Sequence, residues 1–175
     1  MTIPLFPDSS EDDPTSLTHF IEIRFHASHR RQLPELLSLA QKVERVHAGD
    51  PQAPAGLAKL LEGMAQELEV HMRKEEAVLF PAIRQGGMLG LEHPIAVMRA
   101  DHDEHDKDIA AICNLTNNLS LPLGACRSWA ALYEGLGQFI ADFETHMHLE
   151  NDVLFPKFEK PHQHQGCGCA CQGHD

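Results

Sequence analysis

HMRKEEAVLFP at residues 71–81 is repeated as HMHLENDVLFP at residues 146–156, with seven of the eleven positions identical. A shorter repeat has nearly the same offset, because an HxxH motif at residues 26–29 returns at residues 102–105. Both repeats carry histidine, and the longer one also carries glutamate. A duplication of these residue types predicts a site with two-fold symmetry, to which two equivalent halves of the chain bring the same ligands.

Both copies of the longer repeat continue an amphipathic helical pattern. The apolar residues before them follow one another in steps of four and three, the spacing of one buried face of an α-helix. The two series are Leu57, Leu61, Met64, Leu68, His71, Glu75, Val78 and Trp129, Leu132, Leu136, Phe139, Phe143, His146, Glu150. Residues four apart on a helix point to the same spot. A carboxylate on a buried face is costly unless it is paired or binds a metal, which favours a metal site over surface ion pairs.

Prolines and glycines divide the chain into four long helices. We expect helices over residues 14–47 with a break at Pro34, and over 55–80, 94–117 and 126–150. No stretch alternates as a half-buried strand does. Four such helices predict an all-α, up-down four-helix bundle with an internal two-fold repeat. We expect residues 1–13 to be a mobile acidic leader, 14–160 the bundle, and 161–175 a disordered tail rich in histidine and cysteine.

Charge and hydropathy exclude several classes of protein. A formal net charge of −12 argues against binding to nucleic acid or to an anionic membrane surface. The N-terminal residues lack the basic and apolar regions of a signal peptide, and no apolar run reaches membrane length. We therefore expect a cytoplasmic protein with neither nucleic acid nor membrane as a partner.

The types of ligand narrow the choice of metal ion. Imidazole and carboxylate without thiolate suit non-haem iron or manganese better than structural zinc. The two repeats supply His26, His71, His102, His146, Glu75 and Glu150. These are too many for one tetrahedral ion, and they suit two octahedral ions that both carboxylates bridge. The remaining histidines His19, His29, His93 and His148 are expected to be surface or capping residues.

The residues alone do not decide whether a further ligand is His105 or His47. His105 continues the apolar face of the third helix. His47 lies 21 residues after His26, or about 31 Å along one straight helix. It could reach the site only if the chain breaks between them, and Pro34 is the expected place.

Five stretches resemble the repair-of-iron-centres family of hemerythrin-like di-iron domains, the ScdA/YtfE/DnrN type. They are FHASHRRQLPEL (25–36), KVERVHAGDP (42–51), ELEVHMRKEEAVLFPAI (67–83), PIAVMRADHDEHD (94–106) and ETHMHLENDVLFPKF (144–158). The resemblance implies two non-haem iron ions, expected to be oxo-bridged. It implies as their ligands His26, His47, His71, Glu75, His102, His146 and Glu150. It thus favours His47 over His105, which is then expected to lie beside the ligands.

The same resemblance implies a function in the response to nitrosative and oxidative stress. The protein is expected to help repair damaged iron–sulfur clusters by donating iron to apo or damaged iron–sulfur proteins. A non-enzymatic, metal-binding repair role is favoured over an enzymatic one, which stays open. The alternative is a scavenger or sensor that binds nitric oxide or dioxygen. Many members of the family carry an N-terminal domain with a cysteine pair, and we expect this protein to be a short form without that domain. Cys167, Cys169 and Cys171 either replace that pair or have only incidental metal affinity.

Overall fold

The computed structural model describes residues 13–87 and 90–159, and every regular element within these ranges is a helix. The α-helices are α1 (Pro14–Ile21), α2 (Ala27–Val46), α3 (Leu57–Lys74), α4 (Phe80–Arg84), α5 (Glu92–Leu115) and α6 (Arg127–His148). Three π-helical turns, Glu22–His26, Glu75–Leu79 and Leu149–Leu154, and a 3₁₀ turn, Phe155–Lys157, continue some of them. The expected all-α fold is confirmed. All but the last residue of the predicted leader and the whole of the predicted tail lie outside the described residues.

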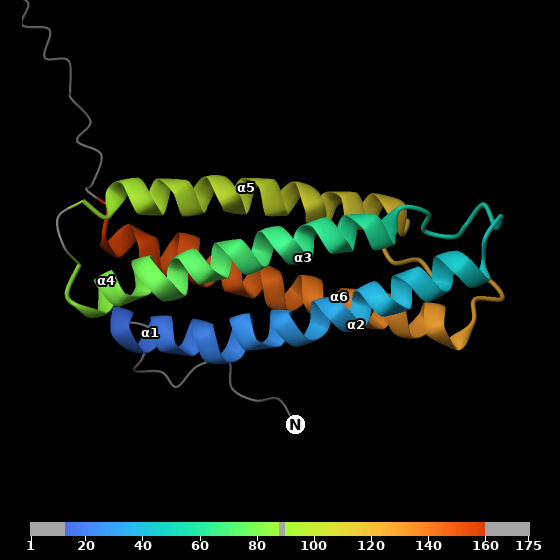
Figure 1. The fold of residues 1–175 in the computed structure, drawn as a ribbon, viewed down its shortest axis with the longest axis horizontal. Coiled ribbons are helices and arrows are strands. Elements are labelled where there is room, and N and C mark those ends of the chain that lie inside the picture. Colours follow the sequence, from blue (N-terminus) through green and yellow to red (C-terminus); the bar gives the residue numbers. More distant parts are fainter. Residues whose placement is uncertain (1–12, 88–89, 160–175) are drawn as a thin grey trace, which may run out of the picture.

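The elements join into four antiparallel rods (Figure 1). The rods are α1 with α2, α3 with α4, α5 alone, and α6 with the turns that follow it. Each rod runs opposite to the one before it, which is the up-down order that the sequence predicts. Helix α2 packs against both α3 and α6, α3 also packs against α5, and α1 packs against α4.

Pro34 does not interrupt the first rod, and the predicted break there is wrong. Helix α2 runs from Ala27 to Val46 with Pro34 inside it. A proline removes one backbone hydrogen bond from a helix. Pro34 is exposed, so the carbonyl group that loses its partner can bond to water. His47, which caps the end of α2, is therefore separated from His26 by the whole length of α2.

The π-helical turns shift which side chains face the core. The predicted apolar face of α3 continues to Val78, but 61% of Val78 is exposed. Leu79 and Phe80 are buried in its place. A π-helical turn inserts an extra residue into the helix, so every later side chain moves round by one position. The same kind of turn follows His146, and there Leu154 and Phe155 are the buried pair.

The core consists of two apolar clusters on either side of a polar layer. One cluster fills the end of the bundle where α2 meets α3, and includes Leu36, Leu61 and Trp129. The other fills the opposite end, and includes Leu17, Phe80 and Phe155. Along all four rods, the buried histidines and glutamates of the repeats fall between the residues of these clusters. Apolar packing from both ends thus isolates the polar layer from water.

Two glycines of α6 test how closely α6 packs on α2. A Cβ atom at Gly135 would lie 2.9 Å from Leu36 Cδ2, whereas one at Gly137 would lie 3.6 Å from Leu119 Cδ1, an ordinary contact. We expect Gly137→Ala to raise the free energy of unfolding by up to about 1 kcal/mol, the gain in helix propensity. Gly135→Ala should gain less, because the buried Leu36 side chain must move. Urea denaturation measures both, and an equal gain would contradict the close packing.

Candidate metal centre

Six buried side chains of the two repeats converge in the polar layer. They come from all four rods of the bundle. They are His26, His71, Glu75, His102, His146 and Glu150, and none is more than 2% exposed. The structure thus brings together six of the seven ligands that the sequence and the resemblance predict.

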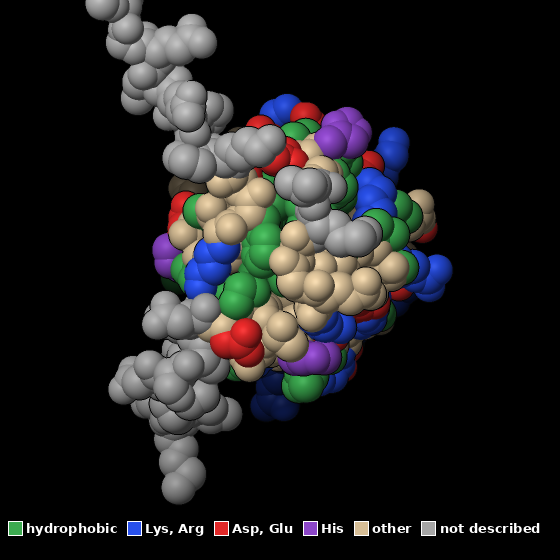
Figure 2. Space-filling model, turned by 90° about the vertical axis from the view of Figure 1, so that its left-hand side faces the viewer, with side chains coloured by type: hydrophobic (Ala, Val, Ile, Leu, Met, Phe, Trp, Pro, Cys, Tyr) green, Lys and Arg blue, Asp and Glu red, His purple; other side chains and the backbone are tan. Residues whose placement is uncertain are grey.

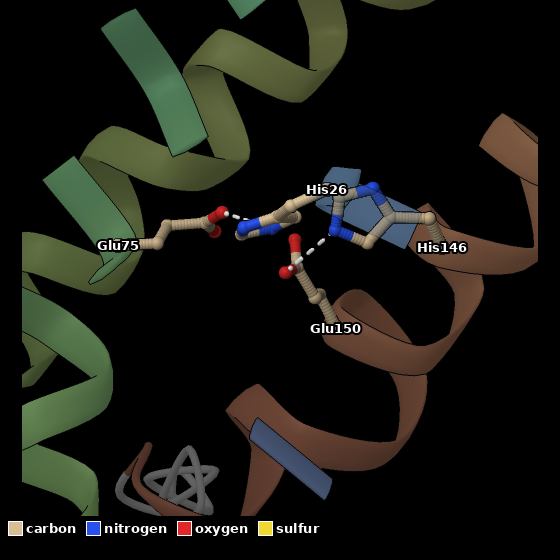
Figure 3. Close-up of side chains that lie close together, drawn as sticks. All are labelled: His26, Glu75, His146 and Glu150. Atoms are coloured by element: carbon tan, nitrogen blue, oxygen red, sulfur yellow. Dashed lines mark hydrogen bonds and ion pairs between the residues drawn. The ribbon is translucent and has the colours of Figure 1, made fainter. Parts of the chain in front are cut away.

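The six side chains form two halves, one with His26 and His146 and the other with His71 and His102. Glu75 faces one histidine from each half. Its Oε2 atom lies 3.3 Å from Nε2 of His26, and its Oε1 atom lies 3.4 Å from Nε2 of His71. Figure 3 shows Glu75 reaching from its own rod towards His26 on the first rod. The two oxygens of this carboxylate therefore serve different histidines.

Glu150 repeats the arrangement with the other two histidines. Its Oε1 atom lies 3.0 Å from Nε2 of His146, the contact drawn in Figure 3, and its Oε2 atom lies 3.1 Å from Nε2 of His102. Nε2 of His102 also lies 3.1 Å from Nε2 of His71. All four histidines thus direct Nε2 at the carboxylates.

The side chains form two groups of four donor atoms, each with two imidazole nitrogens and two carboxylate oxygens. The groups are His26, Glu75, His146, Glu150 and His71, Glu75, His102, Glu150. Within each group, the donor atoms all lie within 4.8 Å of one another. Both glutamates belong to both groups. This arrangement can hold two metal ions that share the two carboxylates.

The residue after each shared glutamate orients a histidine from a neighbouring rod. Glu76 Oε1 lies 2.8 Å from Nδ1 of His26, and Asn151 Oδ1 lies 2.9 Å from Nδ1 of His102. Arg30 donates a hydrogen bond of 2.7 Å to Glu76 and so holds that carboxylate in place. A partner on Nδ1 fixes the ring and leaves Nε2 for a metal.

The other two histidines have different partners. Nδ1 of His71 lies 3.4 Å from Asp101 Oδ2, which also accepts a hydrogen bond of 2.9 Å from Lys74. Nδ1 of His146 lies 3.3 Å from Nε2 of His29. The two halves of the centre are therefore equivalent in their metal donors but not in these outer contacts.

The duplicated Leu-Phe-Pro sequence places a phenylalanine ring against a histidine of the centre in each half. Phe80 stacks on His26 with ring centroids 5.7 Å apart, and Phe155 stacks on His102 at 5.8 Å. In each case the ring belongs to the residue that directly follows the π-helical turn containing a shared glutamate. One repeat thus supplies a histidine, a glutamate and the aromatic ring that covers a histidine of the preceding rod.

The pKa values of the two shared glutamates shift in opposite directions. Burial and the nearby charge of Glu150 hold the pKa of Glu75 well above its usual range. Burial also opposes ionisation of Glu150, but His146 and His102 outweigh it and hold the pKa of Glu150 well below its usual range. Without a cation, one buried carboxylate is thus stabilised as an anion at the expense of the other.

Most of the buried imidazoles are kept neutral. Burial, with the nearby charge of His146, lowers the pKa of His26 to about 4. Burial likewise lowers the pKa of His71 to about 3. A neutral imidazole is the form that binds a metal, because its nitrogen lone pair is free.

The unpaired polar atoms of this layer fit a pair of cations. Within the described residues, His26 Nε2, both oxygens of Glu75 and Glu150 Oε2 are buried without a hydrogen bond of good geometry. Buried polar atoms are normally paired, and a buried charge normally binds an opposite charge. Two cations would satisfy these atoms together and remove the repulsion between the carboxylates. The residues present therefore fit a two-metal centre.

His47 does not lie with the other six residues, which corrects the assignment taken from the resemblance. Its Nε2 atom lies 3.2 Å from Cys126 Sγ, and its ring lies 4.8 Å from the ring of Trp129. This contact lowers the pKa of Cys126 to about 7. Trp129 and His146 are 17 residues apart on α6, about 25 Å of helix. The unbroken α2 thus leaves His47 at the far end of the bundle.

Sequence reasoning missed two features around the centre. His29, expected at the surface, is fully buried, and burial with the charge of His146 lowers its pKa to about 3. The HxxH repeat was the signal for it, since His105 at the matching position was assigned to the buried face. Glu76 and Asn151 were also missed, because the repeat does not conserve their residue type.

His47 and His146 provide a direct test of the centre. We expect His146→Ala to lose at least one of the two bound metal ions, because it removes one of four donors from a group. We expect His47→Ala to keep both ions, because its side chain lies against Cys126 and Trp129, far from the six converging side chains. Elemental analysis of the purified variants measures the difference. Loss of metal from His47→Ala with retention in His146→Ala would contradict this assignment.

Metal removal should reveal how far the buried glutamates depend on cations. A bound ion stabilises the folded state in proportion to its affinity. We expect chelation to lower the melting temperature of the wild-type protein, and to have a smaller effect on Glu150→Gln, which has already lost a shared carboxylate. Glu144→Gln, an exposed change on the same helix, is the matched control and should respond as the wild type does. Equal responses of all three proteins would contradict the role of Glu150.

The comparisons with known proteins agree with this geometry. Residues 21–158 match the family described as the hemerythrin HHE cation binding domain. The iron-sulfur cluster repair proteins YtfE of Yersinia pseudotuberculosis and Yersinia pestis are each 48% identical to this chain over 155 residues. The match covers 86% of this chain and 70% of each relative. The chain therefore belongs to the hemerythrin HHE cation-binding family and, within it, to the repair-of-iron-centres family.

Proposed function

We propose that the centre holds two non-haem iron ions and that the protein helps repair damaged iron–sulfur clusters by donating iron. The observation that carries this proposal is the pair of donor groups that share Glu75 and Glu150. The relatives named iron-sulfur cluster repair protein support the choice of pathway. The targets would be apo or damaged iron–sulfur proteins in the cytoplasm.

The donor set favours iron over structural zinc. Each group offers two imidazoles and two carboxylate oxygens, and neither group includes a cysteine. Structural zinc sites favour thiolates and a closed set of four ligands for a single ion. Imidazole and carboxylate ligands suit iron. When bound, the iron pair supplies the ions for transfer, and the surrounding residues keep it away from bulk water until then.

The ligand count also favours a second candidate function. The two groups together supply eight metal–ligand contacts, four histidine and four carboxylate. Two octahedral ions offer twelve positions, so not all positions are taken by protein atoms. A small ligand such as nitric oxide or dioxygen could bind there, and the protein would then be a scavenger or sensor.

None of the described helices is long and apolar enough to cross a bilayer.

The first test is the metal content. After anaerobic loading with ferrous iron, we expect close to two irons per chain, because the structure offers two donor groups. Glu75→Ala should lose most of this iron, since Glu75 belongs to both groups. Glu62→Gln, an exposed change on α3 in the same rod, should keep it. A single zinc ion with no bound iron would reject the di-iron proposal.

The second test separates iron donation from ligand binding. The reduced, iron-loaded protein is mixed with an apo iron–sulfur protein and sulfide, and cluster formation is followed by its visible absorption. We expect transfer faster than from the same amount of free iron. A version that ends at Phe158 shows whether the cysteines beyond it take part. Reversible nitric-oxide binding with full retention of iron would instead support the scavenger or sensor.

A further inference from the structure

A groove beside the metal centre contains a second set of metal-binding side chains. It lies between α3 and α5, has a volume of about 440 Å³, and its lining includes Glu67, Lys74, Asp101 and His105. A neighbouring hollow of about 380 Å³ is lined in part by Glu67 and Asp108. Glu67 thus lies where the two hollows meet, and the acidic side chains give this side of the bundle a negative lining.

His105 is the unexplained residue of this groove. Its side chain is only 3% exposed, yet neither ring nitrogen has a hydrogen-bond partner within the described residues. The nearest carboxylate, Asp108, lies 3.9 Å from Nδ1, beyond hydrogen-bonding distance. Leaving a buried polar group unpaired destabilises the folded state. A ligand between these side chains would remove that cost.

Three donors from two helices meet at this point. One ligand atom from each of Glu67, His105 and Asp108 lies within 4.8 Å of the others. Glu67 comes from α3 and is exposed, whereas the other two come from adjacent turns of α5. Burial and the charges of Glu67 and Glu104 raise the pKa of Asp108, which indicates crowded negative charge. A cation would satisfy His105 and relieve this repulsion at once.

The groove also adjoins the metal centre. The His105 ring lies 5.5 Å from the ring of His71, and Asp101 of the groove lining contacts the outer nitrogen of His71. Glu67 precedes His71 by one helical turn. At one end of the bundle, the described residues form an apolar cluster that includes Phe80. Figure 2 shows that end, with hydrophobic side chains across the middle of the face.

We propose that Glu67, His105 and Asp108 form a third cation site, which binds one divalent metal ion on its way between solvent and the centre. One imidazole and two carboxylates suit ferrous iron, manganese and zinc, with water completing the shell. Three donors, two of them accessible to water, make a weak and exchangeable site. The existence of the site does not depend on the proposed function, whereas its role in transit rests on it.

Manganese is the probe for the site itself. The iron-loaded protein is titrated with Mn²⁺, and the loss of the free-ion electron paramagnetic resonance signal counts bound manganese. We expect one exchangeable Mn²⁺ per wild-type chain, with binding weakened at least tenfold in Asp108→Asn and in Glu67→Gln. Asp103→Asn, an exposed change on α5, is the matched control and should bind as the wild type does. Unchanged binding in both site variants would overturn the proposal.

The transit role has its own measurement. Iron loading of the metal-free protein is followed in time, and the final iron content is then determined. We expect Asp108→Asn and Glu67→Gln to load several-fold more slowly and to reach the same final content as the wild type. Loading at the wild-type rate would overturn the transit role. The manganese count stands apart from iron donation, so failure of the proposed function would not produce the same result as failure of this site.

Discussion

Two carboxylates buried in the middle of a helical bundle set the constraint on which the rest of the structure depends. Glu75 and Glu150 are both inaccessible to solvent, and each of their oxygens faces an imidazole. Such groups are tolerated in a core only with compensating partners. Because those partners come from all four rods, the glutamates tie the whole bundle to one polar layer. The metal ions that we propose would complete the compensation.

The same local device builds both halves of this layer. A π-helical turn that contains the glutamate brings the following Phe80 or Phe155 over a histidine of the preceding rod. Such turns occur frequently at functional sites, because they redirect side chains without ending the helix. The third rod, α5, has no such turn and supplies His102 from a regular helix.

The two halves diverge outside the metal donors. Phe25 stacks on His146 with ring centroids 5.4 Å apart, which closes one half with apolar contacts. In the other half Asp101, in the matching position before the histidine, contacts His71 and lines a groove open to water. A symmetric donor set thus has an aromatic ring beside one half and a polar groove beside the other. The third cation site that we propose lies on the side of this groove.

The sequence by itself determined the bundle and the six donors, because a duplicated His-Glu pair on an apolar face is visible in spacing alone. It also assigned His105 to the buried face. Only the tertiary structure decided that His47 lies with Cys126, that His29 is buried, and that Val78 is exposed. Periodicity reports which face of a helix is buried. It does not report the height at which two helices meet, whether a proline breaks a rod, or where a π-helical turn adds one residue.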